Sequence, residues 1–468
     1  MPHPESVRSG WRRELGEILQ IAGPLAGAQL AYMLMGVTDS VMMGRISTDS
    51  LAAGGVGASF AFMMIYLAMG LLQAIQPVVA QGRGAGDHSG FTRILAAGLV
   101  TALICAVPIL AVLLGVERIF LAIGEPPVIA HLSWIYVTAF AWAVPAWLCN
   151  TALRNYLVAL GRTRVIMFTS GTGCLANLVL NWALIFGHLG LPALGLAGSG
   201  YATSIVGWSM TMALFAYAII CRLLPHGMLR LTARELGTGL REIWWLGLPI
   251  AAMWSVETLL FSGSSLLMGR FGPVALAAHQ ICINLCSLTY MVPFAISSAA
   301  TVRVGFQVGA DEPRLARIAG FSALALGVSF MAAAAVAICL FSRPIFRLYL
   351  DVDDPSFAEV EAIGIKLLLL AALFEVFDGT QVVAAGALRG LRDVRLPLIA
   401  GIIGYWVLGF PIGAGLAFGA GLGPVGLWWG FAAGLIVTAF LLSTRFVRLS
   451  AQMQRVGCGE FREATESC

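Results

Sequence analysis

The chain has 468 residues, of which 59% are hydrophobic and only 11% are charged, and its formal net charge is +4. In soluble domains about a quarter of all residues are charged, so this composition excludes a soluble globular protein and indicates an integral membrane protein. Arginines in the loops account for the small positive charge, and we therefore expect no nucleic-acid partner.

The apolar stretches are long and continuous and show no two-residue alternation, which favours spanning helices over the strands of a membrane barrel. A helix needs roughly 20 apolar residues to cross a bilayer. On this rule we predict twelve spanning helices, in two groups of six. They cover residues 16–42, 55–80, 93–115, 130–152, 164–186, 195–222, 240–268, 279–305, 316–341, 360–388, 396–419 and 424–448.

Arginine placement predicts the orientation of these helices. The loops on one side, together with both chain ends, hold most of the arginines, among them Arg12, Arg83 and Arg241. Few arginines fall on the other side: Arg45, Arg118, Arg270, Arg343 and Arg347. Because cytoplasmic loops are enriched in Lys and Arg, both termini are expected in the cytoplasm.

An internal repeat divides the chain into two halves. Pro24 recurs as Pro249, which is an offset of 225 in the numbering, and two short motifs recur at the same offset. These motifs are Met43-Gly44-Arg45 with Met268-Gly269-Arg270, and Leu51-Ala52-Ala53 with Leu276-Ala277-Ala278. Further on the offset becomes 231, as between Arg164 and Arg395, which fits a short insertion in the loop around residues 350–361.

The repeat predicts a duplicated fold: an all-α membrane protein with two lobes of six helices each. An even number of spans per copy makes the two copies parallel, related by an axis along the membrane normal. We expect an N-terminal lobe at 1–225, a cytoplasmic linker at 226–242 and a C-terminal lobe at 243–468 with a short cytoplasmic tail. Prolines inside or at the edges of spans should kink or break helices, and they are Pro24, Pro77, Pro108, Pro145, Pro249, Pro293 and Pro411.

The sequence lacks the residue patterns of several kinds of functional site. The nine cysteines are scattered without a Cys-x-x-Cys pair, so neither a zinc site nor a disulfide framework is expected. No two histidines have metal-ligand spacing, and His279 is expected to be a hydrogen-bonded residue at a helix start. We find no nucleophile with a base, so we predict no enzyme, no cofactor and no dedicated metal site.

Four acidic residues fall deep inside predicted spans: Asp39, Glu257, Glu375 and Asp378. An ionised carboxylate at the middle of a bilayer costs about 2.5–3.5 kcal/mol on insertion scales. Such groups must therefore be protonated, bind a cation or face water, and each option is typical of an ion-coupling site. The alternative is that they satisfy neighbouring donors in a structural role, and this alternative is strongest for Glu375.

Neutral polar residues accompany these acids. Asp378 and Gln381 are three apart on one helix face, and Asn177 and Asn181 are four apart and can face Asp39. Amides beside single acids suit a proton or a monovalent cation better than a divalent one. We therefore predict coupling to H+ or Na+, with Asp39, Glu257 and Asp378 as the coupling acids and with Glu375 in support.

These residues resemble the multidrug and toxic compound extrusion (MATE) family, within it the NorM-like branch, over nearly the whole chain. The motifs that carry the resemblance are Val37-Thr38-Asp39-Ser40-Val41-Met42-Met43-Gly44-Arg45, Ala277-Ala278-His279-Gln280-Ile281, Thr301-Val302-Arg303-Val304-Gly305, Asp378-x-x-Gln381 and Gly386-Ala387-Leu388-Arg389-Gly390. The resemblance implies a two-lobed exporter of the bacterial inner membrane that exchanges a cation for organic, often cationic, compounds. We expect a monomer whose partners are small organic substrates and membrane lipids.

By the same likeness, Asp39 with Asn177 and Asn181 forms the site of the first lobe, and Glu257 with Asp378 forms the cation site of the second. This chain departs from sodium-coupled relatives at Phe374, where they carry a tyrosine, because phenylalanine supplies no oxygen. The repeat does not copy the acids, since Glu257 falls opposite Tyr32, Asp39 opposite Ser264, and Asp378 opposite residues 147–149.

Two alternatives to a drug antiporter stay open. A flippase for lipid-linked precursors, from the wider superfamily, should have a strongly cationic cavity, whereas the deep charges here are mostly acidic. A membrane protein without transport activity would not need Asp39, Glu257 and Asp378 deep in its spans. The sequence leaves the substrate, the choice between H+ and Na+, the oligomeric state and the physiological role undecided.

Overall fold

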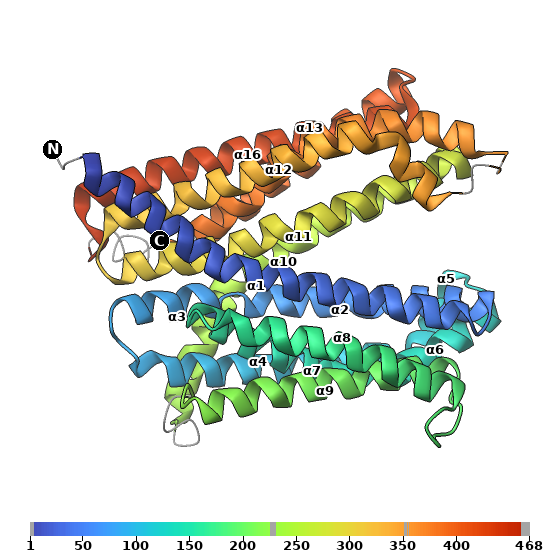
Figure 1. The fold of residues 1–468 in the computed structure, drawn as a ribbon, viewed down its shortest axis with the longest axis horizontal. Coiled ribbons are helices and arrows are strands. Elements are labelled where there is room, and N and C mark those ends of the chain that lie inside the picture. The colour runs from blue at the N-terminus through green and yellow to red at the C-terminus, as the bar shows by residue number, and fades with distance from the viewer. Residues whose placement is uncertain (1–3, 225–230, 351–352, 354, 460–468) are drawn as a thin grey trace. The chain divides into compact units, whose positions relative to one another are not determined.

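The computed structural model describes residues 4–224, 231–350, 353 and 355–459. Its regular elements are helices, and this described part of the chain contains no strand, as the predicted all-α class requires (Figure 1). The first half contains α1 (Pro4–Gly44), α2 (Thr48–Leu72), α3 (Ile75–Gly84), α4 (Ser89–Leu114), α5 (Val116–Ile123), α6 (Pro127–Ala141), α7 (Ala143–Ala159), α8 (Thr163–Phe186) and α9 (Leu196–Ile220). The second half contains α10 (Ala233–Met268), η2 (Gly269–Phe271), α11 (Pro273–Gly309), α12 (Pro313–Tyr349), α13 (Phe357–Gly390), α14 (Arg395–Gly401), η3 (Ile402–Gly409), α15 (Phe410–Ala414), η4 (Gly415–Gly419) and α16 (Gly423–Val456).

The predicted spans match these helices in order. Within the described residues, ten helical segments are long and apolar enough to cross a membrane, and the bent pair α6 and α7 gives an eleventh if it is one span. The 34-residue helix α13 lies where we predict the tenth span. The chain is therefore a multi-pass membrane protein. The insertion predicted around residues 350–361 falls between α12 and α13, partly outside the described residues.

The helices gather into two compact units. The N-terminal unit comprises Gly23–Gly82 and Asp87–Ala251, and the C-terminal unit comprises the chain up to Ala22, Arg83–Gly86 and the chain from Ala252 onward. The predicted lobe boundary at 226–242 stays a prediction, and residues 225–230 lie outside the described part. From Ala233 onward, however, the predicted linker is helical.

An N-terminal cap explains why α10 begins earlier than the predicted span. The Thr232 hydroxyl accepts a hydrogen bond from the Glu235 N–H at 3.3 Å, and the Glu235 carboxylate accepts one from the Thr232 N–H at 2.8 Å. This reciprocal pair is a capping box, which satisfies two N–H groups that a helix start leaves without partners. The Thr-x-x-Glu spacing could have been recognised in the sequence.

Two prolines break spans that hydropathy predicts as single helices. Pro77 follows the gap between α2 and α3, and Pro145 follows the junction of α6 and α7, which bend by 46° at Trp142. Each break lies about four residues before the proline, because the ring has no N–H to donate and clashes with the carbonyl four residues earlier. At the first break, Asn155 of α7 donates to the Leu72 carbonyl at 2.9 Å.

Side-chain hydroxyls join helices within the N-terminal unit. Helix α9 packs against α6, α7 and α8, and α2 packs against α6 (Figure 1). The Ser204 hydroxyl of α9 donates to the Ala139 carbonyl of α6 at 2.8 Å, and the Ser133 hydroxyl of α6 donates to the Ala53 carbonyl of α2 at 2.8 Å. In a bilayer such interhelical hydrogen bonds and close packing replace the hydrophobic effect as the cause of helix association.

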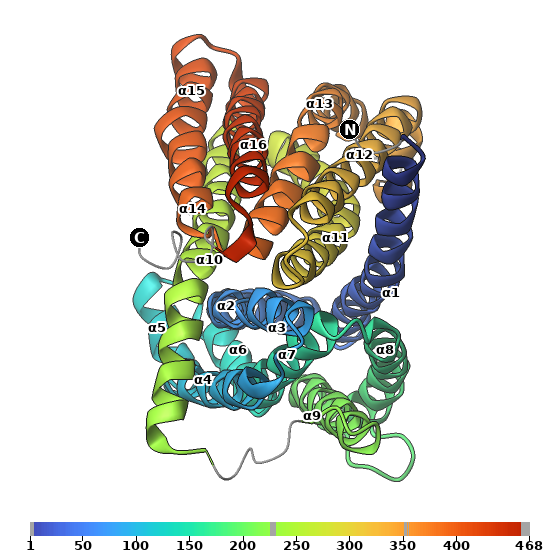
Figure 2. The ribbon, with the colours of Figure 1, turned by 90° about the vertical axis from the view of Figure 1, so that its left-hand side faces the viewer.

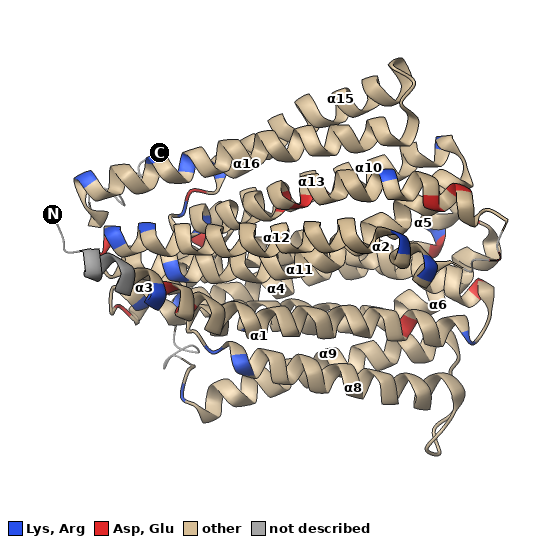
Figure 3. Ribbon diagram, turned by 45° about the horizontal axis from the view of Figure 1, so that its top comes forward, with Lys and Arg blue, Asp and Glu red and all other residues tan. Residues whose placement is uncertain are grey.

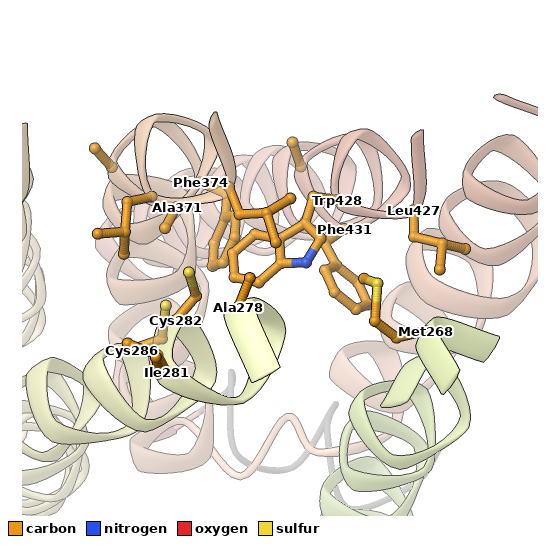
Figure 4. Close-up of a cluster of buried hydrophobic side chains, with 14 of the residues drawn as sticks. Met268, Ala278, Ile281, Cys282, Cys286, Ala371, Phe374, Leu427, Trp428 and Phe431 are labelled. Carbon is orange, nitrogen blue, oxygen red and sulfur yellow. The ribbon is translucent and has the colours of Figure 1, made fainter. Parts of the chain in front are cut away.

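An aromatic cluster forms part of the core of the C-terminal unit. Helix α13 packs against α11, α12 and α16, and the rings of Phe374, Trp428 and Phe431 meet between α13 and α16 (Figure 4). The Phe374 and Trp428 ring centroids are 5.4 Å apart. The Trp428 indole N–H donates to Nδ1 of the buried His279, and the other ring nitrogen of His279 lies 3.0 Å from the Ser265 hydroxyl.

The eleventh predicted span differs most from expectation. Instead of one α-helix it comprises α14 and α15, which the π-helical segment η3 joins, followed by the π-helical segment η4, and it lies beside α16 (Figure 2). Glycines allow the close approach, because a Cβ at Gly409 would lie only 3.0 Å from the Gly430 carbonyl, and one at Gly413 only 3.2 Å from the Gly430 Cα. Small residues at four-residue spacing are typical of closely packed membrane helices.

A buried ion pair anchors the start of α1 in the C-terminal unit. Arg303 of α11 donates to both carboxylate oxygens of Glu14, at 2.7 and 2.9 Å, and Gln307 donates to the same carboxylate at 2.6 Å. The Glu14 side chain is 1% exposed and that of Arg303 is 9% exposed. Glu17, one turn later, lies 3.5 Å from Arg303 but is 42% exposed.

We predict that Glu14→Gln destabilises the protein by about 3–5 kcal/mol, because it removes the buried carboxylate that neutralises Arg303 and leaves only the half-exposed Glu17 as its acidic partner. Glu17→Gln is the matched control and should cost less than about 1 kcal/mol, since that pair is half-exposed. Chemical denaturation of both variants in detergent measures the difference. Equal losses would show that burial of the pair has no energetic consequence.

Candidate functional site

Asp39, a predicted coupling residue, sits at the meeting point of three helices in the N-terminal unit. Its Oδ1 accepts hydrogen bonds from the amide nitrogens of Asn177 at 3.1 Å and Asn181 at 2.6 Å, both on α8. Its Oδ2 accepts from the Thr203 hydroxyl of α9 at 3.2 Å. Both asparagines are fully buried and Asp39 is half-buried. The predicted grouping of Asp39 with both asparagines is therefore present in the structure.

Thr203 is the member of this group that sequence reasoning missed. It stands in a span with many hydroxyl residues, Ser199, Ser204 and Ser209 among them, so its residue type did not distinguish it. The two asparagines were recognisable because a four-residue spacing puts both amides on one face of α8. They also bond to each other, since Asn181 donates to the Asn177 side-chain oxygen at 3.2 Å.

Glu257 and Asp378 meet at one amide in the C-terminal unit. The Gln381 side-chain nitrogen donates to Glu257 Oε1 of α10 and to Asp378 Oδ1 of α13, both at 3.2 Å. Asp378 is 6% exposed, and the Gln381 side-chain oxygen is buried without a hydrogen-bond partner. Neither acid forms an ion pair within the described residues. The structure thus brings the three predicted residues together and leaves one amide oxygen available.

Glu375, predicted as a supporting residue, lies one turn before Asp378 and has a different partner. Its Oε2 accepts a hydrogen bond from the Thr289 hydroxyl of α11 at 2.7 Å, and its Oε1 is buried without a partner. The side chain is fully buried. Glu375 and Asp378 lie in the second half of α13 (Phe357–Gly390), whose other acidic residues, Glu359 and Glu361, lie near its start; Figure 3 colours acidic residues red. Thr289 was also missed, because its bond to Glu375 joins residues 86 positions apart.

Phe374, which supplies no oxygen for a cation, is part of the core. Phe374 is 1% exposed and packs its ring against Trp428 and Phe431. In the described part of the chain, no three His, Cys, Asp or Glu side chains lie close enough together to form a metal-binding group. Any cation at Glu257 and Asp378 would depend on oxygens from neutral groups as well.

The sequence model of the MatE family matches the chain twice, at residues 24–183 and 249–414. The starts of the two matches differ by 225 in the numbering and their ends differ by 231, and these are the two offsets of the internal repeat. The family profile therefore covers one copy of the duplicated unit at a time.

Full-length relatives agree with this match. A protein of Burkholderia pseudomallei named probable multidrug resistance protein NorM is 41% identical over 449 residues, 94% of each chain. The multidrug resistance protein NorM of Burkholderia vietnamiensis is 42% identical over 440 residues, 93% of this chain and 94% of its own.

A solved structure shows the same fold. The eukaryotic MATE transporter AtDTX14 superposes with a TM-score of 0.83 over 94% of this chain and 96% of its own, at 22% sequence identity. With two matches to one family model and relatives similar over nearly their whole length, the chain belongs to the MatE family, the multidrug and toxic compound extrusion family, in its NorM-like branch.

Proposed function

We propose that the chain is a secondary transporter that exports organic, often cationic, compounds in exchange for H+ or Na+. The observation that carries the proposal is the group of Glu257, Asp378 and Gln381, in which two acids from different helices share one amide and form no ion pair with any residue that the structure describes. Relatives named as multidrug resistance proteins support the substrate class, small organic molecules.

The group suits a cation that comes and goes. Two neighbouring carboxylates repel each other in a low dielectric, so binding one H+ or one Na+ between them relieves the repulsion. The Gln381 nitrogen satisfies one oxygen of each acid, and its unpartnered oxygen is a further ligand for Na+ or an acceptor for a carboxyl proton. The same residues therefore serve either ion.

We propose that Asp39 is a second site that takes up and releases H+. Three neutral donors stabilise its ionised form, and they supply no charge that would hold it permanently ionised. A proton on Oδ1 would face two N–H donors, so one amide would have to rotate. If Asn181 rotated, its side-chain oxygen, which is buried without a partner, would become the acceptor, and its hydrogen bond to the Asn177 oxygen would be lost. Uptake of a proton would thus change the contact between α1 and α8.

Coupling requires that cation and substrate favour different conformations of the transporter. We propose alternating access, in which cation occupancy of the acids and substrate occupancy bias the protein toward opposite openings. The first half carries Asp39, whereas the second carries Glu257, Glu375 and Asp378. We therefore propose that the two halves have different roles in the exchange. The cycle changes no covalent bond of the substrate, and we propose no enzymatic activity and no cofactor.

The arginine distribution supports a location in the bacterial inner membrane with both termini in the cytoplasm. We propose that the protein acts there as a monomer among membrane lipids. A flippase for lipid-linked precursors is the second candidate, but the deep charges at Asp39, Glu257, Glu375 and Asp378 are acidic and favour cations over anionic headgroups.

Transport into everted vesicles tests the proposal. With a fluorescent organic cation as substrate, an imposed H+ or Na+ gradient should drive uptake, and Asp378→Asn should reduce that uptake by about tenfold or more. Imposing the two gradients separately identifies the ion. If neither gradient drives uptake, or if Asp378→Asn transports normally, the proposed mechanism is wrong.

A second experiment separates coupling from substrate movement. We expect Asp39→Asn to abolish uphill transport, because an amide cannot take up a proton, while substrate exchange down its own gradient persists. Asp49→Asn is the matched control, since Asp49 is an exposed carboxylate in the first turn of α2. Unchanged uphill transport by Asp39→Asn, or equal defects in both variants, would remove Asp39 from the coupling machinery.

The role of Glu375 can be tested in the same vesicles. If Glu375 takes up a proton of its own, Glu375→Gln should lower the charge moved per substrate and keep the hydrogen bond from Thr289. If it is structural, charge movement stays as in the wild type. Measuring the membrane potential at which net transport stops gives the charge per substrate for both proteins.

A further inference from the structure

Tyr405 is a buried tyrosine of the C-terminal unit whose hydroxyl has no hydrogen-bond partner among the described residues. The side chain is 0% exposed and belongs to the π-helical segment η3. The hydroxyl of Thr438 on α16, which interacts with it, donates its own proton to the Gly434 carbonyl at 2.9 Å. A buried tyrosine hydroxyl usually has a partner, because an unpaired one loses its hydration without replacement. The lone pairs of the Tyr405 oxygen are thus free to bind a ligand.

A contact with α10 holds this part of η3 beside Glu257. The Trp406 indole N–H donates to the Val256 carbonyl at 3.2 Å. Because Trp406 follows Tyr405 and Val256 precedes Glu257, this bond fixes the register of the two segments at the acid. Tyr405 also interacts electrostatically with Glu257 and Asp378. The tyrosine therefore lies in the surroundings of the acid pair.

Glycines bring η3 close to its neighbours. A Cβ at Gly401, the last residue of α14, would contact the sulfur of Met253, which lies one turn before Glu257 on α10. A Cβ at Gly404 would lie 2.8 Å from the Gly434 carbonyl of α16. Close packing on two sides thus fixes the backbone that carries the tyrosine, in a π-helical turn of the kind that is frequent at functional sites.

Two neutral oxygens without partners accompany the acids. The Gln381 side-chain oxygen and the Tyr405 hydroxyl are both buried and form no hydrogen bond within the described residues. With the carboxylates of Glu257 and Asp378 they form a set of oxygen donors from three segments, α10, α13 and η3. A proton needs one oxygen, whereas an alkali-metal cation needs several oxygens to replace its hydration shell. This set of donors therefore suits Na+ better than H+.

We propose that the Tyr405 hydroxyl oxygen is a ligand of a Na+ ion held by Glu257, Asp378 and Gln381, and that it makes this site selective for Na+ over H+. It supplies from η3 the oxygen that Phe374 cannot supply from α13. The phenol is neutral, so it adds a ligand without adding charge, which suits a monovalent ion. This inference rests on the proposed function, because it names the coupling ion of that transporter.

Equilibrium binding of radioactive Na+ to the purified full-length protein tests the proposal without any transport. Tyr405→Phe removes only the hydroxyl and should raise the dissociation constant for Na+ by roughly 10-fold, as loss of one polar contact to a charged group does. Asp378→Asn should reduce binding further. Tyr201→Phe is the matched control, since Tyr201 is an exposed tyrosine of α9, and its dissociation constant should equal that of the wild type.

Thermal unfolding separates a ligand from a structural residue. Melting temperatures are compared in NaCl and in KCl at equal ionic strength, because a bound ion stabilises the folded protein by mass action. In Tyr405→Phe the melting temperature in KCl should stay as in the wild type, while the extra stability in NaCl falls. If Tyr405→Phe does not fold, Trp406→Phe serves instead, since losing the bond to Val256 should also weaken Na+ binding.

An unchanged dissociation constant in Tyr405→Phe, or an equal loss of stability in both salts, would overturn the inference. Wild-type protein that binds no Na+ but moves an organic cation under an H+ gradient would also overturn it, and the proposed function would stand. If neither an H+ nor a Na+ gradient drove transport by the wild type, the proposed function would fail and this inference with it. Selective loss of Na+ binding in Tyr405→Phe supports it.

Discussion

The candidate site depends on the free-energy cost of placing an ionised carboxylate inside a membrane helix. Neutral amides and a hydroxyl donate to Asp39, Glu257 and Asp378, and these acids form no ion pair with any residue that the structure describes. The contrast with Glu14 is instructive: Arg303 neutralises that buried acid with two hydrogen bonds, which fixes the start of α1 and leaves no charge to exchange. We propose that acids held by neutral donors gain and lose a cation more readily than an acid paired with arginine.

Much of the fold was predictable because it follows from local rules. Hydropathy located the helices in order, and the repeat offsets reappear in the two matches to the family model. The breaks near Gln73 and Trp142 follow from Pro77 and Pro145, and the early start of α10 follows from a Thr-x-x-Glu pattern that hydropathy ignores. The π-helical segment η3 packs closely against α16 at Gly409, and no local rule predicts it.

Part of the candidate site could be predicted from the sequence and part could not. The pairing of Asn177 with Asn181, and of Asp378 with Gln381, could be predicted because three- and four-residue spacings on a helix fix which side chains share a face. Thr203 and Thr289 could not, since each meets its acid from a distant part of the sequence, on another helix. The repeat adds a constraint of its own: it copied the contact between two spans but not its charge, so Tyr32 and Asn150 meet where Glu257 and Gln381 meet in the other unit.

The central claim is that the deep acids hold a cation that the substrate displaces. It is tested most directly by mixing purified protein with substrate in weakly buffered detergent solution while a pH indicator and a sodium electrode record ion release. The account predicts release of H+ or Na+ on substrate binding by the wild type, and none by a variant that combines Asp39→Asn, Glu257→Gln and Asp378→Asn. Substrate binding without release of either ion by the wild type would contradict it.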